Sequence, residues 1–256
     1  MIGDSLSTKG DRHISGETKG LSFAERLERD LGDDFEFINV ACPGTTALNW
    51  SLSQPGALCP FHPWDAFPNG ILRDRALPQL PVDVATVLLG TNDAVRRSDS
   101  GYVSPEDFGR VIDEIVDALL EGGAKTVVLI APPDIDTPEA HGRIRAYRDQ
   151  VIARCGTSEQ RVCGPDLFAL LDLNTHFAAG DDPLRPGYDP TQADIHPNAQ
   201  GHARMAEAVG ETLRQVRASQ QRFDATWVAA LVLALGLLAF GVAKRLRRDP
   251  PRRRGE

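Results

Sequence analysis

The sequence contains few cysteines, four in 256 residues, and no cysteine and histidine cluster with the spacing of a zinc site. It has no internal repeat and no excess of basic residues, since 36 acidic residues against 28 basic ones give a net charge of −8. An acidic chain of this kind argues against a nucleic-acid partner. The remaining composition is that of a globular protein, and its length suits one α/β domain or two small ones whose core needs no metal.

Two features are also missing at the N-terminus. The motif "GDS" at residues 3–5 is a common way to present a nucleophilic serine at the end of a strand, yet only Met1 and Ile2 precede it. No secretory signal precedes it either. Without a central strand its neighbours would keep unpaired backbone groups. We therefore expect that the sequence starts too late, through a mis-assigned start or a truncation, and holds Ser5 poorly.

A long uncharged run is present near the C-terminus. Residues 225–243 read "ATWVAALVLALGLLAFGVA", without a single charged side chain. A helix of that length spans about 28 Å, close to the thickness of membrane hydrocarbon. Seven basic residues and two acidic ones follow in 244–256, and the rest of the chain carries −13. These features predict a single-pass transmembrane helix rather than a buried core helix, with a cytoplasmic tail and an extracytoplasmic domain at the cell membrane.

The four cysteines form two local pairs along the chain. Cys42 is close in sequence to Cys59, and Cys155 is closer still to Cys163. In an exported domain this arrangement predicts two disulfides, one within each pair. Four cysteines allow three pairings, and four buried unpaired thiols are the alternative.

Apolar runs and capping signals predict alternating strands and helices over residues 1–217. Strands are expected at 35–41, 84–90, 126–131 and 161–164, and helices at 22–31, 105–121, 138–154 and 198–216. Such alternation indicates βαβ units and a parallel sheet, with reactive groups beyond the carboxyl ends of the strands. A polar linker at 218–224 is expected between this domain and the predicted transmembrane helix.

Four motifs lie at these expected strand ends or before the last helix: "GDS", "ACPG" ending at Gly44, "GTND" at 90–93 and "DIHPN" at 194–198. A serine hydroxyl needs a base to take its proton, and His196 is the candidate, with Asp194 to orient it. The backbone N–H groups of Ser5 and Gly44 and the side-chain amide of Asn92 are candidate donors to an oxyanion.

Each motif has an ordinary structural explanation when taken alone. "GDS" is usually a turn, and Asn92 and Asp93 would most often cap a helix after a strand. Trp50 and Trp64, in an irregular insertion over 45–80, either stack on a sugar or acyl chain or simply pack that loop. The other histidines are expected to be structural or solvent-exposed: His13, His62, His141, His176 and His202.

Together the motifs resemble the SGNH (GDSL-type) hydrolase superfamily over residues 1–217. The resemblance implies a three-layer α/β/α, flavodoxin-like fold whose first strand is truncated here, and ester hydrolysis without a metal or other cofactor. It also implies that Ser5 is the nucleophile, that Ser5, Gly44 and Asn92 donate to the oxyanion, and that His196 is the base. In the family the acid lies three residues before the histidine, where this chain has Ala193. Asp194 therefore remains the candidate, with Asp189 and Asp182 in reserve.

The leading hypothesis is a membrane-anchored, extracytoplasmic serine esterase acting on acyl or acetyl esters of a small molecule, lipid or glycan. An O-acyltransferase would use the same acyl-enzyme with a glycan hydroxyl as acceptor, so the sequence does not separate it from a hydrolase. The alternative from another class is a catalytically inactive binding domain with the same fold. The intact Ser5, Asn92 and His196 argue against it.

Overall fold

A computed structural model describes residues 1–8, 21–59, 62–95, 103–134, 138–171 and 196–248. Its main sheet has the order β1-β4-β5-β6, with all neighbouring strands parallel. The strands are β1 (Ile2–Gly3), β4 (Val82–Leu88), β5 (Ala124–Ala131) and β6 (Arg161–Asp166). A separate two-stranded antiparallel sheet joins β2 (Leu58–Cys59) to β3 (His62–Ala66) within the insertion.

An extended segment at 38–42 lies along the free edge of β1. The backbone N–H of Val40 donates to the carbonyl of Met1 at 3.0 Å, and that of Cys42 donates to the carbonyl of Gly3 at 2.9 Å. This segment therefore takes the place of the strand expected at 35–41. Counting it as the second strand in sequence, the spatial order is 2-1-3-4-5, which is the flavodoxin-like order.

This pairing corrects the expectation that too little of the first strand remains to hold Ser5. Ile2 and Gly3 pair with Val87 and Leu88 of β4 on one side and with the 38–42 segment on the other. Two residues of β1 are thus held from both sides, and Ser5 follows directly. The position is a topological switch point, where ligands of such sheets bind.

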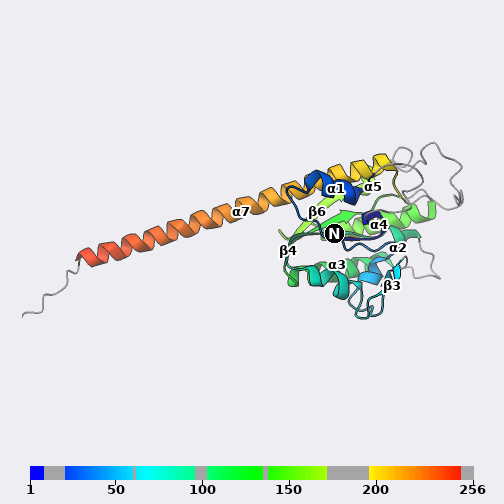
Figure 1. Cartoon of the computed structure of the whole chain (residues 1–256), viewed down its shortest axis with the longest axis horizontal. Helices are drawn as coiled ribbons and strands as arrows, with labels where there is room; N and C mark the ends of the chain where they lie inside the picture. The colour runs from blue at the N-terminus through cyan, green and yellow to red at the C-terminus, as the bar shows by residue number, and fades with distance from the viewer. Residues whose placement is uncertain (9–20, 60–61, 96–102, 135–137, 172–195, 249–256) are drawn as a thin grey trace, which may run out of the picture. The chain divides into compact units, whose positions relative to one another are not determined.

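Helices cover both faces of the sheet. One face carries α3 and α4, and the other carries α1 together with the first turns of α7 (Figure 1). The helices are α1 (Phe23–Leu31), α2 (Thr91–Val95), α3 (Pro105–Glu121), α4 (Pro138–Arg154), α5 (Leu167–Leu170) and α7 (Ala199–Arg248). The parallel sheet between two helical layers agrees with the α/β architecture expected from the alternation of strands and helices.

Local capping explains where the helices begin. The hydroxyl of Ser22 accepts from the N–H of Glu25, whose carboxylate accepts from the N–H of Ser22, which completes the expected capping box. Ser104 caps α3 in the same way by accepting from the N–H of Asp107. Such caps are typically worth about 1 kcal/mol each.

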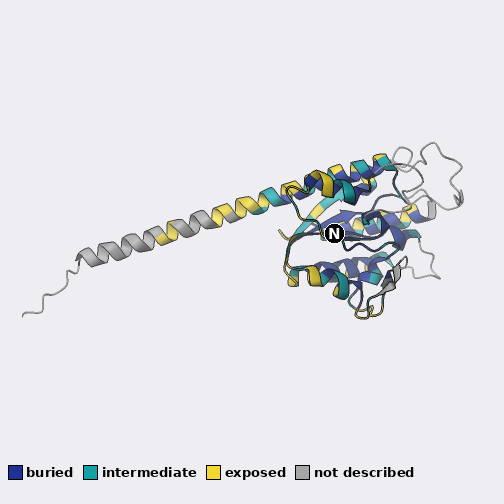
Figure 2. Cartoon of the chain, viewed as in Figure 1, coloured by how far each residue is buried: buried dark blue, intermediate teal, exposed yellow. Residues whose placement is uncertain are grey.

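The core lies on both faces of β4 and β5, which are buried between the helices (Figure 2). Phe108 and Tyr147 pack their rings at 4.6 Å and join α3 to α4 on one face of the sheet. The hydroxyl of Tyr147 donates to the carbonyl of Val103 at 2.6 Å, so its polar end is satisfied inside the core. Full burial of a large apolar side chain such as Phe108 stabilises the fold by about 1.5–3 kcal/mol.

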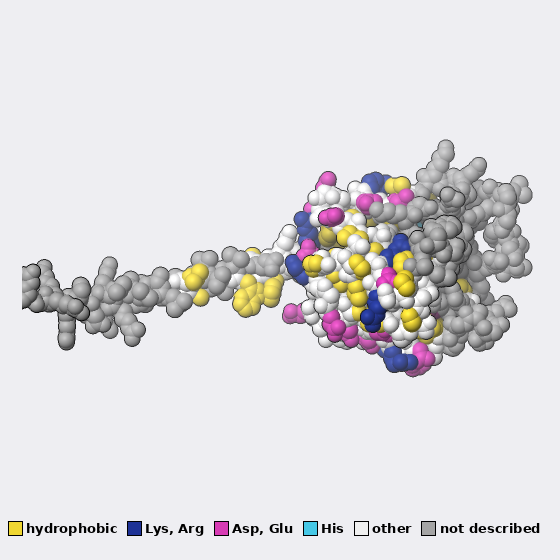
Figure 3. Space-filling model, turned by 60° about the horizontal axis from the view of Figure 1, so that its bottom comes forward, with side chains coloured by type: hydrophobic (Ala, Val, Ile, Leu, Met, Phe, Trp, Pro, Cys, Tyr) yellow, Lys and Arg dark blue, Asp and Glu magenta, His cyan; other side chains and the backbone are white. Residues whose placement is uncertain are grey.

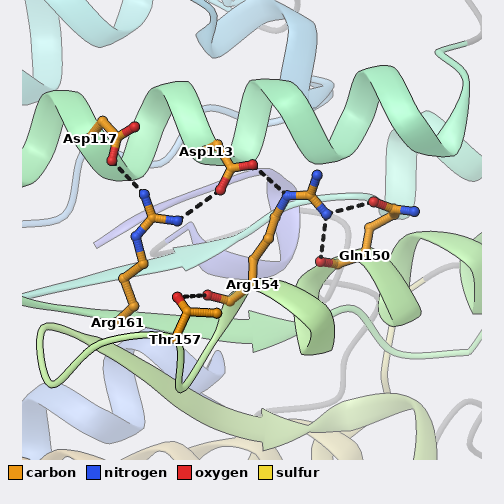
Figure 4. A network of polar contacts seen from close by, with 6 residues as sticks. All are labelled: Asp113, Asp117, Gln150, Arg154, Thr157 and Arg161. Atoms are coloured by element: carbon orange, nitrogen blue, oxygen red, sulfur yellow. Dashed lines mark hydrogen bonds and ion pairs between the residues drawn. The ribbon is translucent and has the colours of Figure 1, made fainter.

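Both predicted disulfides are present: Cys42 is joined to Cys59, and Cys155 to Cys163. The second bridge joins Cys155, which follows Arg154, to Cys163, two residues after Arg161. These two arginines belong to a polar network that links α3, α4 and the start of β6 (Figure 4). In that network the carboxylate of Asp113 accepts from Arg154 at 2.9 Å and from Arg161 at 2.8 Å. Arg161 begins β6, so the network lies at the amino ends of the strands, whereas Ser5 lies beyond the carboxyl end of β1.

The chain divides into two compact units, residues 1–212 and 213–256. Within the second unit, α7 continues through the segment predicted as a polar linker. Crossing a membrane takes about 20 predominantly apolar residues in one helix. Among the residues that the structure describes, no helix is long and apolar enough to do so, which contradicts the transmembrane helix expected at 225–243 and the membrane contact inferred from it.

Candidate active site

The "GDS" turn is shaped by close packing and by its own hydrogen bonds. A Cβ on Gly3 would lie 2.2 Å from Oγ of Ser7 and 2.9 Å from the carbonyl oxygen of Leu88, so only glycine fits there. The buried carboxylate of Asp4 accepts from the N–H of Leu6 at 3.0 Å and caps the short 3-10 turn that begins at Ser5. The motif therefore fixes the backbone at the point where Ser5 leaves the sheet.

His196 lies against Ser5, although the two are 191 positions apart in sequence. Nε2 of His196 is 2.9 Å from Oγ of Ser5, which is a hydrogen-bond distance. Just after His196, Asn198 starts α7: its side-chain oxygen accepts from the N–H groups of Gln200 and Gly201 at 2.9 and 3.0 Å. The "HPN" motif thus joins the histidine to a capped helix start.

The candidate acid lies outside the described residues. Asp194 and the two reserve carboxylates, Asp189 and Asp182, all fall within 172–195. The assignment of the acid therefore stays a prediction.

Gly44 and Asn92 come from adjacent turns at the carboxyl ends of the strands. Gly44 has a φ of +73°, a left-handed conformation that glycine adopts without strain. Nδ2 of Asn92 donates to the carbonyl oxygen of Thr45 at 3.0 Å, next to Gly44. A primary amide has two N–H donors, so this bond orients Asn92 and uses one of them.

Further contacts hold the turn that carries Gly44. Both oxygens of the Asp93 carboxylate are 3.1 Å from the backbone nitrogen of Ala47. The hydroxyl of Thr45 donates to the carbonyl of Cys42 at 2.7 Å and accepts from Nε1 of Trp50 at 3.0 Å. "GTND" therefore supplies one candidate oxyanion donor, Asn92, and one residue that anchors the neighbouring turn.

A family model of the GDSL-like lipase/acylhydrolase family matches residues 1–204 of this chain. The chain belongs to that family. It is accordingly a serine hydrolase that acts on carboxylic ester bonds. No curated protein has a sequence that matches it.

Solved structures with a similar fold are distant in sequence. An acetyl xylan esterase, AlAXEase, is 17% identical with a TM-score of 0.54, over 82% of this chain and 98% of that one. A lipolytic protein of the G-D-S-L family from Veillonella parvula is 16% identical with a TM-score of 0.52, over 82% and 94%. A family two carbohydrate esterase from Clostridium thermocellum, in complex with cellohexaose, is 16% identical with a TM-score of 0.52. The match covers 84% of the hydrolase and only 62% of the Clostridium chain.

The structure gives Trp50 a packing role in the hydrolase. Its side chain is fully buried and its indole N–H is bonded to Thr45, so it supports the turn and does not face a substrate. The side chain of Trp64 lies outside the described residues. The Cys42–Cys59 bridge ties the insertion to the same turn.

Sequence reasoning gave no specific role to His202, a buried histidine six residues after His196. The residue is 1% exposed, and its Nδ1 accepts from the backbone N–H of Phe23, the first residue of α1, at 3.2 Å. Burial, together with the nearby His196 and Arg26, lowers the pKa of His202 to about 4. The i, i+3, i+7 spacing of His202, Met205 and Val209 in the sequence indicates that they share one face of a helix. In the structure all three side chains of that face are buried.

Proposed function

We propose that this hydrolase removes acetyl or other short acyl groups from glycans outside the cytoplasm, through an acyl-enzyme on Ser5. The observation that carries the proposal is the 2.9 Å distance between Oγ of Ser5 and Nε2 of His196. A serine hydroxyl becomes a nucleophile when an adjacent base takes its proton, and a hydrogen bond of this length allows that transfer.

The reaction has two halves. In the first, Oγ of Ser5 attacks the ester carbonyl as its proton passes to Nε2 of His196. The bond between the carbonyl carbon and the alcohol oxygen then breaks, and His196 gives the proton to the departing alcohol. In the second half, water attacks the acyl-Ser5 carbonyl, His196 takes the proton of the water and returns it to Ser5, and the carboxylic acid leaves. Asp194 is the residue proposed to orient His196 and to stabilise its protonated form.

Both halves pass through a tetrahedral intermediate with a negative oxygen. We assign its stabilisation to the backbone N–H groups of Ser5 and Gly44 and to the side-chain amide of Asn92. The bond from Asn92 to Thr45 supports this assignment, because it holds the amide in place before substrate arrives. Donors that need no reorganisation during the reaction contribute most to such stabilisation.

The two disulfides support a location outside the cytoplasm. Disulfides persist in oxidising compartments and are rare in the reducing cytosol. All four cysteines of the chain are paired in this way. On the face drawn in Figure 3, acidic side chains are exposed as well as basic ones, so this face is not the uniformly basic surface that a nucleic-acid partner would need.

Two of the structural neighbours support the choice of a glycan ester. One is an acetyl xylan esterase, and the other is a carbohydrate esterase in complex with cellohexaose.

The acceptor of the acyl group distinguishes hydrolysis, in which it is water, from transfer to a second glycan. Free acetate released from an acetylated oligosaccharide supports the proposal, whereas acetyl groups that reappear on a second glycan would show an acyltransferase.

Labelling with a fluorophosphonate probe tests the nucleophile directly. Ser5→Ala should abolish both labelling and hydrolysis of p-nitrophenyl acetate, because it removes the hydroxyl that lies 2.9 Å from His196. Ser7→Ala is a matched control: Ser7 is buried two residues away, and its Oγ has no partner among the described residues. Labelling that survives in Ser5→Ala, or is lost equally in both variants, would remove Ser5 from its proposed role.

A further inference from the structure

A second histidine–carboxylate pair lies at the carboxyl ends of the strands. Nδ1 of His141 is 2.8 and 2.9 Å from the two carboxylate oxygens of Asp134. The side chain of Asp134 is 10% exposed and that of His141 is 47% exposed. A largely buried carboxylate therefore fixes one edge of an imidazole that remains open to solvent on its other side.

The position of this pair follows from the sheet. Asp134 comes three residues after β5, and His141 lies in the first turns of α4, which returns from that end. Ser5 and Asn92 follow β1 and β4 at the same edge. The β5 and β4 turns touch there, because Pro132 lies 3.2 Å from where a Cβ on Gly90 would be.

A neighbouring aromatic ring helps to hold His141. Phe168, in α5 directly after β6, has its ring centre 5.4 Å from that of His141. The guanidinium of Arg148 lies 5.5 Å over the Phe168 ring and is itself fixed by the carboxylate of Asp166 at 2.6–3.0 Å. The imidazole is thus preorganised, with its Nε2 making no hydrogen bond to any described residue.

We infer that Asp134, His141 and Phe168 form a binding subsite for a sugar hydroxyl in the alcohol part of the ester. This inference rests on the glycan esterase function proposed above. The Nε2 atom of an imidazole whose Nδ1 faces a carboxylate accepts a hydrogen bond when the ring is neutral and donates one when it is charged. A hydroxyl group is both donor and acceptor and therefore pairs with either form. An anionic group is disfavoured, because the adjacent Asp134 carboxylate opposes it.

The separation of this subsite from Ser5 indicates the size of the substrate. Strands in a sheet are about 4.8 Å apart, so β5 lies about 10 Å from β1 across β4. That distance exceeds the ester group itself. The subsite therefore contacts a neighbouring sugar unit of an oligosaccharide or polymer, whereas p-nitrophenyl acetate has no sugar hydroxyl to bind there.

The test compares two substrates in the full chain. His141→Ala should raise KM for acetylated xylotetraose about tenfold, as expected for the loss of one hydrogen bond, with kcat nearly unchanged. The same variant should hydrolyse p-nitrophenyl acetate with wild-type kcat and KM. His141→Gln keeps a side-chain donor and acceptor and should restore KM for the oligosaccharide to within about threefold of wild type.

Each other outcome overturns the inference. Equal losses on both substrates would mean that His141 only supports the fold or the catalytic residues. An unchanged KM on acetylated xylotetraose would mean that no sugar hydroxyl is bound there. If wild-type protein hydrolyses p-nitrophenyl acetate but not the acetylated oligosaccharide, both the subsite and the glycan substrate are wrong while the esterase assignment stands. If neither substrate is hydrolysed, the proposed function itself fails.

Discussion

Replacing His202 should remove a large part of the acid sensitivity of the fold. The ring is buried between α7 and α1, and its Nδ1 accepts the first N–H of α1, which has no partner within that helix. Protonation would place a charge in a buried site beside His196 and Arg26, which is why the pKa of His202 falls from 6.5 to about 4. His202→Asn is the informative variant, because its amide keeps an acceptor for Phe23 and does not titrate.

The sign of the effect follows from proton binding. Between pH 6.5 and 4 the unfolded chain carries a proton on His202 and the folded chain does not. Acid therefore favours unfolding, and the contribution of His202 to stability is intact above pH 6.5 and is lost progressively as the pH falls towards 4. With these two pKa values the loss at pH 5 is about 2 kcal/mol, and it approaches about 3 kcal/mol below pH 4.

Urea denaturation of wild type and His202→Asn at pH 7.5, 6, 5 and 4.5 measures this contribution. The free energy of unfolding of the wild type should fall about 2 kcal/mol more than that of the variant between pH 7.5 and pH 5, as the linkage between proton binding and folding requires. Gln200→Ala provides the control, because Gln200 is exposed in the first turn of the same helix and does not titrate, so its removal should leave the pH dependence close to that of wild type. Parallel curves for wild type and His202→Asn would refute the reasoning, since they would mean that His202 titrates alike in the folded and unfolded chains.

Two further predictions concern the turn that carries Gly44. Asn92→Ala should lower kcat on p-nitrophenyl acetate by about 10²–10³, as expected when one oxyanion donor is lost, whereas Asn69→Ala, an exposed asparagine bonded to Asp74, should leave kcat unchanged. A similar kcat for the two asparagine variants would count against an oxyanion role. Cys59→Ser should cost about 3 kcal/mol in urea denaturation and also lower kcat, because it frees the turn after Cys42. Cys163→Ser opens the bridge beside the network of Figure 4 and should lower stability alone; equal kcat losses in both cysteine variants would contradict this link.

The elements that could be predicted are those with local causes. Continuous apolar runs indicate buried parallel strands, and β4 and β5 lie within two residues of the ranges expected from them. The starts of α1 and α3 are set by Ser22 and Ser104, each bonded to a backbone N–H three residues ahead. The disulfides also join cysteines that are close in sequence.

Two predictions made from composition and segment length alone were wrong, one for the helix near the C-terminus and one for the first strand. An uncharged run predicted a membrane span, which the described residues do not contain. The chain before "GDS" looked too short to hold Ser5, yet Ile2 and Gly3 are paired on both sides. Neither partner of β1 could be read from residues 1–5, because the pairing depends on the segments at 38–42 and 87–88, far along the chain.

The candidate site belongs to the tertiary structure for the same reason. The motifs identified Ser5, Gly44, Asn92 and His196 as candidates, but the 2.9 Å contact between Ser5 and His196 exists only because β1 and the start of α7 meet at one edge of the sheet. His202 bonded to Phe23 and His141 bonded to Asp134 carried no motif and were expected only as structural or exposed residues. The sequence by itself determines which chemical groups the protein carries. The burial, partners and charge state of each histidine depend on residues that only folding brings together.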